Sequence, residues 1–145
     1  MIIARLLTKI IAPEVHIRKT NGDTEFEWNT NTIYFNPATN IYDVGFARHI
    51  EEKHFFPNPT KYSMPLWSLL HELGHYFNPD EEEDIESKAI CAALPYELAQ
   101  ANITLQNMYY DSPDEYAATE WAIDWITQHP RLSSLFSILL KPSKD

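Results

Sequence analysis

The five residues His71-Glu72-Leu73-Gly74-His75 constrain this chain most, because they match the H-E-x-x-H pattern of zinc hydrolases. On an α-helix, residues four apart lie on one face about 6 Å apart along the axis, so both imidazoles can reach one metal ion. Glu72 lies about 100° around the helix, where its carboxylate can take a proton from a bound water. The motif therefore predicts two zinc ligands and a general base. The alternative is a helix with two surface histidines and a glutamate that bind nothing.

The residues around the motif favour a helix. Ser63 can cap it, Pro65 is tolerated in a first turn, and Asn78-Pro79 ends it. Gly74 is costly inside a helix, and its missing side chain would let another backbone approach closely or would relax crowding beside the histidines. Apolar residues at three- and four-residue spacing predict a buried stripe, formed by Leu66, Leu69, Leu70, Leu73 and Phe77.

Length and composition predict one domain over residues 1–145, because 145 residues with 44% apolar content can bury an ordinary core. The net charge of −10 argues against nucleic acid and against an anionic membrane surface as partners. A single cysteine, Cys91, excludes an intramolecular disulfide, and its apolar surroundings predict a buried small residue rather than a zinc ligand.

The N-terminal apolar segment is interrupted by Arg5 and Lys9, so its apolar runs are too short for a signal sequence or a membrane span. Its paired apolar residues predict an amphipathic helix docked on the core. With no export signal and no disulfide, we expect a cytoplasmic protein.

The remaining pattern predicts an α+β fold with a small three-stranded sheet and about five to six helices. The β-prone runs are residues 14–19, 25–28 and 32–35, and helical spacing recurs at residues 42–56, 80–100, 112–128 and 132–140. The acidic residues 80–86 are expected in the first turns of a helix, where they favour its dipole, rather than in a second cation site. His49 and His54 are five apart, on different helix faces, which argues against a joint metal site.

A hydrolytic zinc site usually has three protein ligands and one open position, so the two histidines need a partner. The candidates are Glu115 and Glu120, which are five apart, so at most one of them serves. Glu115 fits a capping box that begins at Ser112, which would turn its side chain back to the helix start. We nevertheless prefer Glu115 and keep Glu120 as the runner-up. The reason is that Glu115 shares its face with small residues that allow close helix packing, namely Ala118, Thr119 and Ala122.

HELGH followed by Glu115-Tyr116-Ala117-Ala118 resembles the gluzincin metallopeptidases, in which the glutamate of a helical E-x-x-A motif is the third zinc ligand. Within that group, the small size and the sheet before the active helix resemble the minimal gluzincins and the ImmA/IrrE-type peptidases of phages and mobile elements. The resemblance covers residues 14–128. It implies a zincin-like fold with an active-site helix and a glutamate helix, a bound Zn²⁺, and a peptide substrate on an edge strand, for which Thr32 to Phe35 is the candidate. Thr119 stands where Asp or Asn is common in such families.

The predicted activity is that of a zinc-dependent metalloendopeptidase, in which Glu72 takes a proton from the zinc-activated water and passes it to the leaving amine. Tyr109, Tyr110 or His129 could donate a hydrogen bond to the oxyanion. The alternatives are a non-proteolytic zinc hydrolase of small amides and a regulatory binding module on a zincin scaffold. A formyl-peptide hydrolase is disfavoured, because that family takes its third ligand from an upstream cysteine and Cys91 lies downstream.

Overall fold

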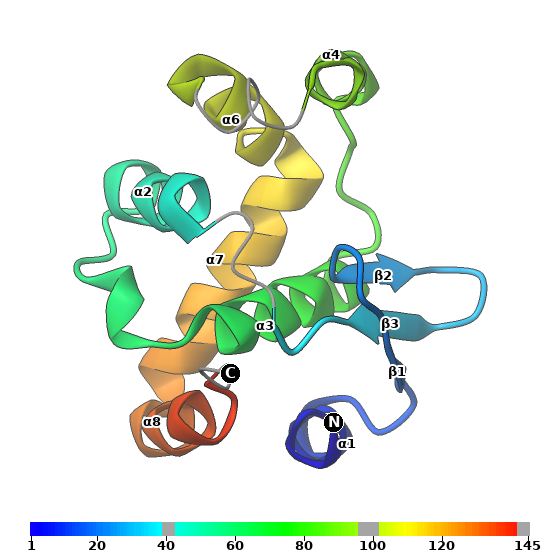
Figure 1. The fold of residues 1–145 in the computed structure, drawn as a ribbon, viewed down its shortest axis with the longest axis vertical. Coiled ribbons are helices and arrows are strands. Elements are labelled where there is room, and N and C mark those ends of the chain that lie inside the picture. The colour runs from blue at the N-terminus through cyan, green and yellow to red at the C-terminus, as the bar shows by residue number, and fades with distance from the viewer. Residues whose placement is uncertain (39–42, 96–101, 142–145) are drawn as a thin grey trace.

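The computed structural model describes residues 1–38, 43–95 and 102–141, and arranges helices around a small sheet (Figure 1). The described residues form seven α-helices and three strands, which confirms the predicted α+β class. The helices exceed the expected number because the described residues between the motif helix and the glutamate helix form two helices where one was expected. In chain order the elements are α1 (Ile2–Ile11), β1 (His16–Lys19), β2 (Glu25–Glu27), β3 (Thr32–Phe35), α2 (Asp43–Lys53), the 3-10 turn η1 (Pro59–Lys61), α3 (Met64–Phe77), α4 (Ile85–Ala93), α6 (Ile103–Tyr110), α7 (Pro113–Gln128) and α8 (Pro130–Leu139).

The sheet has the strand order β1-β3-β2, in which β3 pairs parallel with β1 and antiparallel with β2. The prediction that Thr32 to Phe35 is an edge strand is therefore wrong, because both edges of β3 are occupied by neighbouring strands. Ile33 and Phe35 are fully buried, whereas every residue of β1 and β2 is exposed or half-buried. The most apolar strand takes the middle position, since burial there stabilises the sheet most.

Helices α3 and α7 cross at the centre of the molecule and form its most extensive interface between helices (Figure 1). As predicted, Ser63 caps α3, because its hydroxyl accepts a hydrogen bond from the amide of Leu66 at 3.4 Å. The helix ends at Asn78, whose side chain donates to the carbonyl of Gly74 at 2.7 Å. The four leucines of the predicted stripe are fully buried, but Phe77 is 42% exposed and stacks on Trp121.

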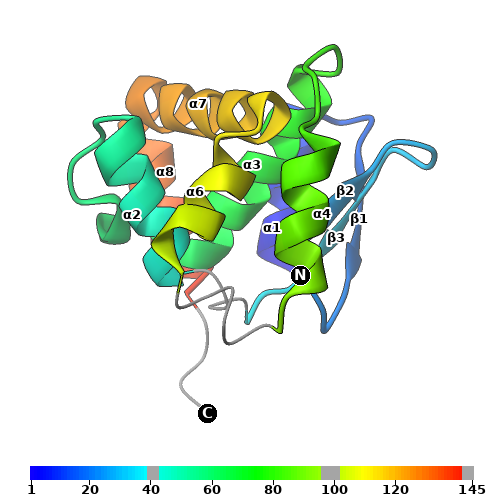
Figure 2. The same cartoon turned by 90° about the horizontal axis from the view of Figure 1, so that it is seen from above.

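The outer helices complete the core from several sides. Figure 1 places α4 and α6 above α3 and α1 and α8 below it, and Figure 2, which views the molecule from above, shows α4 and α6 next to each other. The prediction that the N-terminal helix docks on the core is confirmed, because Ala4, Leu7 and Thr8 of α1 are buried. Within the described parts of the chain, no helix is long and apolar enough to cross a membrane.

Helix α4 begins later than the sequence indicated. Residues 80–84 precede the helix, and Asp84 is its N-cap, accepting a hydrogen bond from the amide of Ser87 at 3.0 Å. The acidic run is therefore a connection that leads into the helix start instead of forming its first turns. Helix α2 lies within the predicted segment 42–56, of which residue 42 is outside the described residues.

Candidate metal centre

Helix α3 presents both histidines of the HELGH motif on the side that faces α7. His71 is buried and His75 is half-buried, and their ring centroids lie 4.9 Å apart. Glu72 projects beside them, and the ligand atoms of His71, Glu72 and His75 lie within 4.8 Å of one another. The helical spacing thus has the consequence expected from the sequence, which is a compact group of donor atoms on one turn.

Gly74 is what lets α7 approach this group. A Cβ atom at Gly74 would overlap the carbonyl oxygen of Ala118 and lie 2.8 Å from the Cα atom of Ala118. The small residues predicted to line this contact are fully buried, namely Ala118, Thr119 and Ala122. The prediction that Gly74 allows another backbone to approach is confirmed, and the close approach brings the first turn of α7 next to the histidines.

Glu115 extends from that first turn of α7 to both histidines. Its Oε2 atom lies 2.6 Å from Nε2 of His71 and 3.2 Å from Nε2 of His75. The carboxylate is buried, with 6% of the side chain exposed. Glu115 does not complete a capping box with Ser112, because the hydroxyl of Ser112 makes no cap hydrogen bond and instead donates to Asp114. The position of Glu115 is compatible with a metal ligand, and this role stays a prediction.

The donor set fits a zinc ion. Zinc ligands lie about 2.1 Å from the ion, so two donors of a tetrahedral site lie about 3.4 Å apart. The distance of 3.2 Å between His75 and Glu115 is close to that value, and the 2.6 Å between His71 and Glu115 needs to open by less than about 1 Å. Two imidazole nitrogens and one carboxylate oxygen are the ligands typical of hydrolytic zinc sites.

Glu72 is held by the backbone of the sheet. Its Oε2 atom accepts a hydrogen bond of 2.9 Å from the amide of Phe26, at the outer edge of β2. This amide points away from β3, so β2 is the strand whose free edge lies beside the motif. The backbone amide of Phe26 thereby orients the carboxylate of the candidate base, and no sequence pattern predicts this contact.

Electrostatics separates the two carboxylates of the site. Burial, together with the charge on Glu115, raises the pKa of Glu72 against the opposing effect of the two histidines. Burial also disfavours ionised Glu115, but its hydrogen bonds with His71 and His75 outweigh this and hold the pKa of Glu115 well below its usual value. Burial likewise opposes a charge on His75, yet the bond to Glu115 and the nearby carboxylates raise the pKa of His75 to about 9. Glu115 therefore stays anionic, as a ligand must, while Glu72 moves towards the range that suits a general base.

Two further residues support the donor atoms. The hydroxyl of Thr119 lies 3.0 Å from Nδ1 of His71, so Thr119 orients this imidazole. Lys88 of α4 places its ammonium 2.8 Å from Oε1 of Glu115. Sequence reasoning missed Lys88, because a lone lysine on a separate helix belongs to no motif.

A cavity of about 740 Å³ opens in front of the site and is lined by His71, Glu72, His75 and Glu115. Tyr109 also lines it, and burial together with the charge on Glu115 raises the pKa of Tyr109 well above its usual value, which keeps its hydroxyl protonated. Tyr110 reaches the same cavity but is 7% exposed and packs against Phe46 and His49. Of the two predicted tyrosines, Tyr109 has the position of a hydrogen-bond donor.

Cys91 lines the cavity too, and the expectation that it is fully buried is wrong. It lies on α4, a helix without buried residues, and its thiol donates to the carbonyl of Leu105 at 3.1 Å. The apolar sequence around Cys91 therefore lies at the rim of the cavity instead of in the core.

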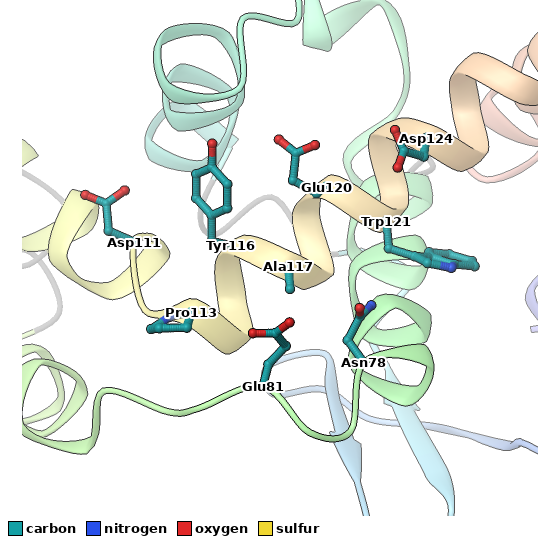
Figure 3. A pocket seen from close by; sticks show the side chains of 9 residues that line it. All are labelled: Asn78, Glu81, Asp111, Pro113, Tyr116, Ala117, Glu120, Trp121 and Asp124. Atoms are coloured by element: carbon teal, nitrogen blue, oxygen red, sulfur yellow. The ribbon is translucent and has the colours of Figure 1, made fainter.

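Glu120, the alternative ligand, lies elsewhere. Its Oε1 atom is 2.5 Å from Nδ1 of His54, and 43% of its side chain is exposed. Figure 3 shows Glu120 and Tyr116 projecting from the same side of α7, and both line a second cavity of about 520 Å³ that the metal-site histidines do not line. His49 forms a similar pair with Asp111 at 2.8 Å, and the rings of His49 and His54 lie 5.2 Å apart. Each of these histidines is thus paired with its own carboxylate.

His129 does not reach the site. It follows the C-terminal end of α7, stacks on Trp125, and its Nδ1 atom bonds to the carbonyl of Trp125 at 2.9 Å. Fourteen residues of helix separate it from Glu115, a rise of about 20 Å. The suggestion that His129 stabilises an oxyanion is therefore wrong. His16 is exposed on β1, as expected for a strand-face residue.

Comparison of the chain with protein-family models, with curated proteins and with solved structures finds no match. The assignment of this site therefore rests on its own residues and geometry.

Proposed function

We propose that this chain is a zinc-dependent metalloendopeptidase of the gluzincin type, similar to the ImmA/IrrE-type peptidases, with His71, His75 and Glu115 as the zinc ligands. The observation that carries the proposal is the approach of one carboxylate oxygen of Glu115 to both histidines of the HELGH motif. Glu115 lies forty residues after His75 in the sequence, so it is improbable that its carboxylate lies beside both histidines by chance.

A zinc ion held by these ligands would supply a Lewis acid that activates water and polarises a substrate carbonyl. Glu72 is the residue that would take a proton from the attacking water and pass it to the leaving amine, a role that its raised pKa supports. Tyr109 lines the same cavity and keeps its proton, so it is our candidate donor to the oxygen that gains negative charge.

Two features support a peptide as the substrate. The cavity of about 740 Å³ falls within the range of ligand sites, and it is lined by apolar side chains that include Phe26, Trp28 and Phe46. The free edge of β2 borders this cavity, and an extended chain can pair with such an edge. With a single cysteine, the chain suits a reducing cytoplasm, where we expect it to act.

The test is metal analysis combined with a matched pair of variants. Purified protein should hold about one zinc ion per chain, the stoichiometry of a three-ligand site. Glu72→Gln should retain the zinc but lose hydrolysis of casein or of a peptide library, whereas Glu115→Gln should lose the zinc as well. Glu120→Gln is the control and should retain both. Full activity in Glu72→Gln would reject the mechanism, and cleavage of small amides without any peptide cleavage would instead favour a non-proteolytic amidohydrolase.

A further inference from the structure

Helix α4 covers one side of the cavity, yet the apolar core does not hold it in place. None of its nine residues is buried, and Ile85 and Ile90 are 71% and 44% exposed. A helix of this length is marginal without tertiary contacts, so other interactions must fix it. Helix α4 lies against α6, where the thiol of Cys91 donates to the carbonyl of Leu105, and polar contacts join it to the start of α7.

Lys88 is the centre of these contacts. Its Nζ atom lies 2.7 Å from Oδ2 of Asp114, 2.8 Å from Oε1 of Glu115 and 3.4 Å from Oε1 of Glu83. The ammonium also lies 5.2 Å from the centre of the Tyr109 ring. With 15% of its side chain exposed, Lys88 is a largely desolvated cation surrounded by three carboxylates.

The two oxygens of Glu115 have different partners. Oε1 bonds to Lys88, and Oε2 faces His71 and His75. A carboxylate whose second oxygen is free can rotate or bind a metal through both oxygens, whereas a charge-assisted bond to one oxygen fixes its plane. Lys88 thus leaves a single oxygen of Glu115 to the histidines.

A cation this close to a zinc site needs compensation, because like charges repel strongly where water is scarce. Asp114 and Glu83 supply it, since both contact the same ammonium. A simple surface ion pair has one carboxylate, whereas Lys88 has three. Their negative charge allows Lys88 to stay next to Glu115 when a metal ion is bound.

We propose that Lys88 is a positioning residue of the metal centre: it fixes Glu115 through Oε1, so that Oε2 alone binds the metal, and it thereby links the placement of α4 to metal affinity. The proposal rests on the zinc site proposed above. It adds a role for a residue outside the HELGH and E-x-x-A motifs, and it makes helix α4, which covers one side of the cavity, part of the metal site.

The first test measures zinc affinity by competition with a chromophoric chelator. Lys88→Met should bind zinc about 10–100-fold more weakly, the usual effect of losing a group that orients a ligand. Lys88→Arg restores a cation and should come within a few-fold of the wild type. Glu83→Gln removes only the longest of the three contacts and is the matched control, with an expected change of less than about threefold.

The second test uses Co²⁺ in place of zinc, because its visible absorption reports ligand number and geometry. Lys88→Met should change the position and intensity of these bands, as a carboxylate binding through one oxygen becomes free to bind through two. A lysine that merely attaches α4 would lower the thermal stability of the metal-free protein and leave both zinc affinity and the Co²⁺ spectrum unchanged, which would overturn the proposal.

The outcomes separate this inference from the function on which it rests. A wild-type chain that binds no zinc rejects both. A wild-type chain that binds zinc, together with a Lys88→Met variant of equal affinity, rejects the role of Lys88 alone. Should Lys88→Met fail to fold, Lys88→Gln keeps a polar side chain without the charge, and it should show the same loss of affinity if the charge-assisted bond is what matters.

Discussion

Helices α3 and α4 both reach Glu115, but α7 holds them in opposite ways. The α3–α7 contact is made by buried small residues, with the backbone of Ala118 against Gly74. The α4–α7 contact is made by charges and hydrogen bonds, with Lys88 against Asp114 and Glu115. Close packing in the first contact fixes the donor atoms, because packed backbones have no room to move. Polar contacts in the second leave the cover of the cavity sensitive to solvent conditions.

The largest effect on the metal centre should come from adding a methyl group to the α3–α7 contact. In Gly74→Ala the new Cβ meets backbone atoms of Ala118, which cannot rotate away, so the helices must separate. We expect a net loss of about 1–2 kcal/mol in unfolding free energy, after a gain of about 1 kcal/mol in helix propensity, and a loss of zinc binding as Glu115 moves. Urea denaturation and zinc titration measure both.

Gly22→Ala is the matched control for that substitution. A Cβ at Gly22 would make only an ordinary contact of 3.7 Å with the hydroxyl of Thr20. Its unfolding free energy should stay within about 0.5 kcal/mol of the wild type. Equal stability of Gly74→Ala and Gly22→Ala would show that α3 and α7 tolerate separation. Close packing would then no longer distinguish the α3–α7 contact from the α4–α7 contact.

The next effect compares two aliphatic truncations. Leu70 on α3 is fully buried, so Leu70→Ala should cost about 2–5 kcal/mol of unfolding free energy through the cavity it leaves. Ile90 on α4 is 44% exposed, so Ile90→Ala should change it by at most about 0.5 kcal/mol. Chemical denaturation of both variants provides the measurement, and a cost at Ile90 comparable to that at Leu70 would mean that α4 is anchored by apolar packing after all.

Acidification should weaken a third contact, at the junction of α6 and α7. Burial lowers the pKa of His49, and the bond to Asp111 only partly offsets this. A histidine with a folded-state pKa below its unfolded value stabilises the fold above about pH 6.5 and loses that contribution as the pH falls. The melting temperature should therefore drop between pH 7.5 and 5.5 by more in the wild type than in His49→Gln. A parallel drop in both proteins would exclude His49 as the cause.

The smallest effect on global stability should be that of salt on α4. High salt weakens ion pairs, a partly buried one such as that of Lys88 less than an exposed one, whereas it does not weaken apolar packing. In hydrogen exchange followed by mass spectrometry, the amides of α4 should exchange faster in 1 M NaCl than in 0.1 M NaCl, while those of α3 and α7 should not change. Uniform behaviour of the three helices would indicate that Lys88 is not what holds α4.

The sequence predicted the helix of the HELGH motif well because its signals are local. Ser63 caps it and four leucines form its buried stripe, and neither feature depends on distant residues. The small residues that share the face of Glu115 are a local signal too, and they pack against α3 as expected. The order of the strands was misjudged, because three short β-prone runs do not reveal which of them lies in the middle. The apolar character of Ile33 and Phe35 was the available signal.

By itself, the sequence determined which reactive groups are present and how they are spaced. These are two histidines and a glutamate on one helical turn, a glycine that allows a second helix to approach, and a carboxylate on a face of small residues. These properties follow from residue identity and helical periodicity. Only the tertiary structure decided how that chemistry is supported. The amide of Phe26 meets Glu72, Thr119 meets His71, and Lys88 meets Glu115, across 46, 48 and 27 residues of chain. Such contacts depend on how the elements pack, because no local pattern places a strand edge or a separate helix beside a chosen side chain.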